Sequence, residues 1–166
     1  MSRNCARTIS GIILLAALAL PALAQTQQPL EGPAAPLPAQ FLNAKKVFIA
    51  NGAGDNDPTF AKYTNGPNGP YNQFYANVKG LDRYELAASP SEADVILELR
   101  VDYLRYYERY GYFKLRLEIR DPKTNVLLWT FAEAVTEAIG EKGQRKYVAD
   151  ALAKLTDDLK NVGTKP

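Results

Sequence analysis

Two stretches of alternating side chains most constrain what this chain can fold into. Residues 93–101 alternate Val95, Leu97, Leu99 and Val101 with Ile96, Glu98 and Arg100. Residues 112–120 repeat the pattern, with Phe113, Leu115, Leu117 and Ile119 against Lys114, Arg116, Glu118 and Arg120. A period of two over this length predicts antiparallel strands with an apolar inner face and a charged outer face. A third strand over 126–135 continues the inner face with Leu127, Trp129 and Phe131, and we expect this meander to form the core.

The charges on the first two strands predict how they pair. If the numbers of opposed residues sum to 218, each charge meets its opposite, in the pairs Glu98–Arg120, Arg100–Glu118 and Asp102–Arg116. Sums of 216 or 220 oppose like charges, and odd sums set apolar against polar faces. Each pair is worth only about 0.2–1 kcal/mol, but three agreeing pairs favour one register. That register places Glu108, Arg109 and Tyr110 in the loop.

The remaining elements follow from shorter patterns. The consecutive apolar residues of 46–50 suit a strand buried on both faces. Residues 71–79 have helical spacing with Gly80 placed to end the helix, and 83–87 suit a second short strand. Residues 144–160 predict a helix with one apolar stripe, formed by Val148, Ala151, Leu152, Leu155, Leu159 and Val162. The expected fold is a two-layer α+β domain in the order β-α-β-β-β-β-α, with a mainly antiparallel sheet and the C-terminal helix on its odd-numbered face.

The first 24 residues have the features of a signal peptide. Arg3 and Arg7 form a basic region, 9–20 form an apolar run, and 22–24 read Ala-Leu-Ala before Gln25. The proline-rich residues 25–40 predict a disordered leader, and 41–162 then form a single domain. Cys5 precedes the apolar run, so it is no lipid-attachment site. We expect export by the general secretory route to the periplasm or the outside of the cell, with no transmembrane segment after cleavage.

The composition of the mature chain excludes several kinds of site. Without residues 1–24 the chain has no Cys, Met or His, so Ser-His-Asp triads, Cys-His pairs and the usual zinc sites are excluded. Loss of Arg3 and Arg7 leaves 18 basic against 18 acidic residues, so no surplus of charge points to nucleic acid. No cofactor is expected. A hydrolase built on two carboxylates remains possible in principle, but the strand acids have basic partners, and we predict a protein that is not an enzyme.

The most distinctive candidate site is a tyrosine-rich hairpin. Half of the ten tyrosines lie within residues 103–112. In the expected register Tyr106 and Tyr112 face each other on the outer side, Tyr110 lies at the turn, and Arg105 and Arg109 flank them. Exposed aromatic and arginine side chains suit contact with a protein partner or stacking on sugars. The plainer interpretation is that tyrosines favour strands and stabilise hairpins through cross-strand pairs.

The loop over residues 51–70 is a weaker candidate. Asp55, Asn56 and Asp57 carry oxygen atoms that could bind Ca²⁺. Pro58 and the residues after it do not follow the helix-loop-helix calcium pattern, so a plain turn is favoured and no metal is predicted. The glycines at 52 and 54 follow a strand, but no helix begins directly after them to hold a phosphate.

Two short motifs carry a resemblance to known proteins. Ala-Asp-Val-Ile-Leu at 93–97 and Asp-x-x-Thr-x-x-x-Leu-Trp at 121–129 resemble small exported bacterial proteins of unknown function. The layout of 45–161 is similar, more distantly, to the amino-terminal domain of TolB and to CsgG. The resemblance implies a location in the cell envelope and a role without catalysis. The expected function is envelope binding or assembly, with a protein partner held by the tyrosine hairpin and the outer sheet face. A glycan- or small-ligand-binding module using the same aromatics or the 51–70 loop is the alternative.

Overall fold

The computed structural model describes residues 35–52, 64–107, 110–135 and 140–163, with the side chains of 104–111 left out. Its elements are α1 (Ala39–Asn43), β1 (Lys46–Asn51), α3 (Gly69–Lys79), β2 (Glu85–Leu86), the short 3-10 helix η1 (Pro90–Glu92), β3 (Val95–Tyr107), β4 (Tyr110–Arg120), β5 (Leu127–Val135) and α4 (Glu141–Lys160). The predicted α+β class is confirmed, and so is the order of the predicted strands and helices. Helix α1 adds a short turn that includes Ala39 and Gln40, which the sequence had placed in the leader.

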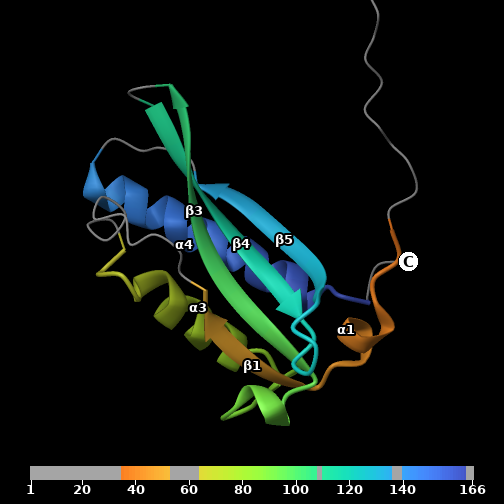
Figure 1. The fold of residues 1–166 in the computed structure, drawn as a ribbon. Helices are drawn as coiled ribbons and strands as arrows, with labels where there is room; N and C mark the ends of the chain where they lie inside the picture. Colours follow the sequence, from red (N-terminus) through yellow and green to blue (C-terminus); the bar gives the residue numbers. More distant parts are fainter. Residues whose placement is uncertain (1–34, 53–63, 108–109, 136–139, 164–166) are drawn as a thin grey trace, which may run out of the picture. The chain divides into compact units, whose positions relative to one another are not determined.

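The sheet is open and mixed, with strand order β2-β1-β3-β4-β5 (Figure 1). Strand β1 runs parallel to both β2 and β3, and only the ladders joining β3, β4 and β5 are antiparallel. The expectation of a mainly antiparallel sheet is confirmed, because the meander supplies most of the pairing, and the parallel ladders of β1 make the sheet mixed. The reason is α3, which carries the chain from β1 over one face of the sheet to β2, and such a crossover joins parallel strands.

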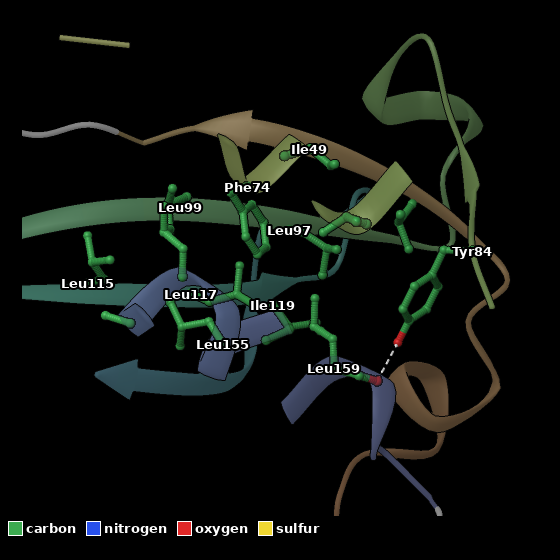
Figure 2. Close-up of a cluster of buried hydrophobic side chains, with 14 of the residues drawn as sticks. Ile49, Phe74, Tyr84, Leu97, Leu99, Leu115, Leu117, Ile119, Leu155 and Leu159 are labelled. Carbon is green, nitrogen blue, oxygen red and sulfur yellow. Dashed lines mark hydrogen bonds between the residues drawn. The ribbon is translucent and has the colours of Figure 1, made fainter. Parts of the chain in front are cut away.

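Both long helices pack on the odd-numbered face of the sheet, as Figures 1 and 2 show. The predicted stripe of α4 is buried throughout, and Phe74 and Val78 of α3 join it. Leu97 and Leu117 are completely buried beneath the helices, and Trp129 packs at the margin of the core. The prediction that β1 is buried on both faces is wrong, because only Val47 and Ile49 reach this core.

The pairing of β3 with β4 differs from the predicted register. Opposed residues sum to 216, so Glu98 faces Glu118 and Arg100 faces Arg116. The strands shift by one residue between Arg105 and Tyr107, and the hairpin closes with Tyr107 opposite Tyr110. The apolar inner face is unchanged by this difference, since a shift of two residues keeps every side chain on its own face.

Opposite charges still meet across the ladder, but along diagonals. Arg120 Nε lies 2.8 Å from Glu98 Oε2, and Arg116 Nε lies 3.2 Å from Asp102 Oδ2. Arg100, which was expected to contact Glu118, instead contacts Glu98 of its own strand at 3.1 Å. Long side chains reach diagonal neighbours on a sheet, so the charges are satisfied in the observed register as well.

A second irregularity changes which face of the sheet the side chains at the start of β5 occupy. The β4–β5 ladder shifts by one residue between Ile119–Trp129 and Arg120–Leu127. Leu127 was predicted on the inner face but is 46% exposed, while Leu128 packs against the core. A bulge of one residue reverses which face the side chains beyond it occupy.

Candidate functional site

The even-numbered side chains of the meander form a surface that we call the outer face. It comprises Ile96, Glu98, Arg100 and Asp102 of β3, Tyr112, Lys114, Arg116, Glu118 and Arg120 of β4, and Thr130, Ala132 and Ala134 of β5. Helices α3 and α4 lie on the other side of the sheet, so neither covers it (Figure 1). An antiparallel sheet often leaves one face in contact with water, and this one carries the side chains available to a partner.

The charges in the middle of the outer face neutralise one another. Glu118 is only 4% exposed because the guanidinium groups of Arg116 and Arg120 lie over it. The hydrogen bond to Glu118 raises the pKa of Arg120 above its usual value. Glu98 and Asp102 are also ion-paired. These acids therefore have the structural role that the sequence predicted for them.

The described part of the tyrosine hairpin lies beside these charges. Tyr112 is 38% exposed on the outer face, but it stands opposite Leu104 and not opposite Tyr106 as predicted. This pairing follows from the register in which opposed residues sum to 216, and Tyr106 lies at the irregularity between Arg105 and Tyr107, outside the regular ladder. The side chains of Arg105, Tyr106 and Tyr110, and all of Arg109, lie outside the described residues.

Strand β5 adds a row of small side chains next to the tyrosine. Ala134 pairs with Lys114 and Ala132 pairs with Arg116, and both alanines are exposed. Because β5 is the last strand of the sheet, this part of the outer face is bordered by an unpaired strand edge. Tyr112, Lys114 and the two alanines thus form a margin with one aromatic, one basic and two small apolar side chains, beside central charges that pair with one another.

Tyr103 contributes an aromatic side chain on the opposite side of the same hairpin. It stands opposite Phe113, with ring centroids 5.0 Å apart, and it is 42% exposed. The alternation in the sequence predicted that the odd-numbered side chains of β3, and so Tyr103, would face the core. Tyr103 lies beyond the residues that the helices bury, so the alternation alone does not reveal its exposure.

A second candidate is a cleft between the start of α3 and the start of α4, which we call the polar cleft. Its volume is about 400 Å³, and it is lined by Thr64, Asn65, Gly69, Pro70, Asn72, Gln73, Arg145 and Val148. The weak calcium candidates Asp55, Asn56 and Asp57 lie outside the described residues. Within the described part of the chain, no three His, Cys, Asp or Glu side chains are grouped closely enough to hold a metal ion.

The two motifs that carry the resemblance have structural roles. The carboxylate of Asp94 accepts hydrogen bonds from the backbone N–H groups of Lys45 and Lys46, at 2.9 and 2.8 Å. Asp121 accepts hydrogen bonds from the backbone of Lys123 and Thr124 in the turn before β5. These bonds lower the pKa of both aspartates. Asp94 therefore ties the start of β1 to the start of β3, and Asp121 shapes the last turn of the meander.

None of the helices in the described ranges is both long enough and apolar enough to cross a membrane. The sequence matches no family model. It also matches no curated protein.

The structure is similar to solved structures of bacterial proteins to different degrees. A Helicobacter pylori protein described as a neuraminyllactose-binding hemagglutinin homolog has a TM-score of 0.50 at 11% identity, over 80% of this chain and 89% of its own. The dodecamer of a PelC variant from Paraburkholderia phytofirmans has a TM-score of 0.46 at 14% identity, over 69% and 86%. A Caulobacter crescentus protein described as a lipoprotein has a TM-score of 0.35 at 17% identity, over 71% and 93%.

At these identities, the match to the Helicobacter pylori protein establishes a shared fold and nothing about activity. Neither a TolB amino-terminal domain nor a CsgG-like domain is among these structures, so that part of the resemblance has no support from them.

Proposed function

We propose that this protein is an exported, non-enzymatic binding or assembly protein of the cell envelope, which contacts a protein partner through the outer face and the tyrosine hairpin. The observation that carries the proposal is the one-sided packing of the fold. Both long helices cover the odd-numbered face, and no helix within the described ranges covers the even-numbered face of the three long strands. The amino-terminal features of the sequence support export.

The chemistry of the open face suits a protein partner. Its central charges are paired within the sheet, so a partner need not compensate an isolated charge. Tyr112, at its margin, is a residue type that is enriched at protein interfaces. The described acids of strands β3, β4 and β5 are all ion-paired, which supports a role without catalysis.

Site-specific photo-crosslinking in intact cells tests the proposal. A photoreactive amino acid is placed at Tyr112, Ala132 or Ala134 on the outer face, and at Tyr147 on α4 as the matched control, since Tyr147 is 39% exposed. We expect all three outer-face positions to crosslink to the same envelope protein and Tyr147 to give no such product. Crosslinks from Tyr147 alone, or none from the outer face, would contradict the proposal.

Substitution then tests the contribution of the hairpin. Tyr106, Tyr110 and Tyr112 are replaced together by Ser, and the thermal unfolding of the variant is compared with that of the wild type. We expect the fold to be kept and the outer-face crosslinks to be lost. Unchanged crosslinking would show that the partner contacts another part of the surface.

A further inference from the structure

The polar cleft lies away from the outer face and is lined mainly by polar side chains. Its volume of about 400 Å³ falls within the range of about 300–1,000 Å³ that is usual for small-molecule sites. It is formed by two segments about 75 residues apart in the chain, 64–73 and 145–148. We propose that the polar cleft binds a sugar acid, that is, a small hydroxyl-rich ligand with one carboxylate.

The lining side chains select hydroxyl groups. Thr64 supplies a hydroxyl, and Asn65, Asn72 and Gln73 supply amides that both donate and accept hydrogen bonds. Within the described ranges, the side chains of Asn72 and Gln73 are exposed and have no hydrogen-bonding partner. Pro70 and Val148 are the apolar members of the lining, so the cleft offers little to an apolar ligand.

Arg145 selects the carboxylate. It is the one charged side chain that lines the cleft within the described residues. Its contact with Glu141 is a surface ion pair of 3.6 Å between exposed side chains, and such pairs are weak. The planar guanidinium can therefore bind a carboxylate with two parallel hydrogen bonds.

The walls of the cleft are held in place before any ligand arrives. Gly69 lies so close to the carbonyl of Thr64 that a Cβ at residue 69 would overlap it. The hydroxyl of Thr64 donates to the carbonyl of Gly66 at 3.0 Å, and the amide of Asn51 donates to Asn68 at 3.0 Å. A site that is already ordered loses less conformational entropy when a ligand binds, so its affinity is higher.

Ligand titration followed by two-dimensional NMR tests this inference. The matched probes are galacturonate and galactose, since the first carries a carboxylate where the second carries a hydroxymethyl group. We expect saturable shifts in residues 64–73 and 145–148 with galacturonate, and binding of galactose that is at least about ten-fold weaker. Trigalacturonate shows whether the site takes a free sugar acid or a residue of an acidic polysaccharide.

The matched variants are Arg145→Gln and Lys146→Gln, which remove the same charge from neighbouring positions on α4. Lys146 is paired with Asp150 at 2.7 Å and does not line the cleft. We expect Arg145→Gln to bind galacturonate as weakly as galactose and Lys146→Gln to behave as wild type. No saturable shift, equal binding of the two sugars by the wild type, undiminished binding by Arg145→Gln, or equal binding of inorganic phosphate would each overturn the inference. Because it uses none of the outer face, its failure leaves the proposed partner contact unaffected.

Discussion

Glu98 lies directly opposite Glu118 across the β3–β4 ladder, and the guanidinium of Arg120 contacts both carboxylates. Like charges in opposed positions destabilise a sheet when nothing separates them. Here Arg120 forms an ion pair with each glutamate and so offsets their repulsion in a triad of three side chains. Glu118 is nearly buried as a result. The outer face is thus organised by a few coupled contacts, and these contacts can be tested one at a time.

Replacing Arg120 with Gln should destabilise the fold strongly. The change leaves Glu118 with Arg116 as its remaining ion-pair partner and leaves the two glutamates opposed. Loss of a charged hydrogen-bond partner at a nearly buried site costs about 1.5–3 kcal/mol. The free energy of unfolding in urea measures this cost.

Arg100→Gln is the control. Among the described residues Arg100 contacts only Glu98, at a half-exposed position, so the cost of this substitution should stay below about 1 kcal/mol. Equal costs for the two variants would contradict the triad.

Gly52→Ala should act through Glu98. A Cβ at residue 52 would overlap the carboxylate of Glu98, which then has to move away from Arg120. We expect a loss of about 1 kcal/mol in the wild-type background, the usual net value of one hydrogen bond. In a Glu98→Ala background the same change should be nearly neutral. A double-mutant cycle of urea unfolding measures the coupling, and additive effects would show that Gly52 is required for another reason.

Asp94→Asn should remove a pH-dependent part of the stability. Hydrogen bonds from the backbone of Lys46 and Lys45 lower the pKa of Asp94 below its usual 3.8 in the folded state. A lowered pKa adds stability above the pKa of the unfolded chain, and this stability is lost as the pH falls through the folded-state pKa. We therefore expect Asp94→Asn to unfold more easily than the wild type at pH 7, and to differ little from it once the pH is below the folded-state pKa of Asp94.

Unfolding in urea at a series of pH values checks this prediction. Asp157→Asn, an exposed position on α4, is the control and should follow the wild type at every pH. A difference between Asp94→Asn and the wild type that persists unchanged at low pH would mean that the charge of Asp94 is not what matters.

Tyr84→Phe should change the response of the fold to alkaline pH. The Tyr84 hydroxyl is buried and donates to the carbonyl of Leu159 at 3.4 Å (Figure 2). Burial raises the pKa of Tyr84 above 10.0, so its stabilising effect is complete below the unfolded-state pKa and is lost as the pH rises through the folded-state value.

Two measurements follow for Tyr84→Phe. At neutral pH its free energy of unfolding should fall by about 0.5–1.5 kcal/mol, the net value of one hydrogen bond. Above about pH 10 the variant should lose less further stability than the wild type does, because the ionising group has gone. Tyr147→Phe, exposed on α4, should leave both properties unchanged. A wild-type alkaline profile for Tyr84→Phe would contradict the assignment to this hydroxyl.

The sequence was sufficient for the core but not for the pairing. Alternation at Leu97 and Leu117, and helical spacing at Leu155 and Leu159, depend only on which side chains avoid water, and all four are buried. The register of β3 on β4 was wrong by two residues because opposed and diagonal charge pairs are worth similar small energies. The observed ladder also contains an irregularity between Arg105 and Tyr107, which no local residue pattern indicates.

For the candidate sites, too, the sequence predicts some features and not others. Exposure of Tyr112 follows from its parity, and it was predicted correctly. The parallel ladder of β1 on β3 and the polar cleft both depend on contacts between distant segments, such as Asn72 with Arg145 around one cleft. Nothing in either segment alone indicates the other, so periodicity and spacing could not reveal the cleft.

The position of β1 between β2 and β3 also has a consequence for the order of assembly. Its hydrogen bonds go to strands that come later in the chain, about 40 and 50 residues further on. Contacts of long sequence separation form slowly, whereas the β3–β4–β5 hairpins can close early. A chain that emerges from its amino end therefore presents residues 46–51 as a strand without partners until Val95 and the residues after it have arrived. Synthesis passes through this interval, in which the unpaired strand is most exposed to aggregation.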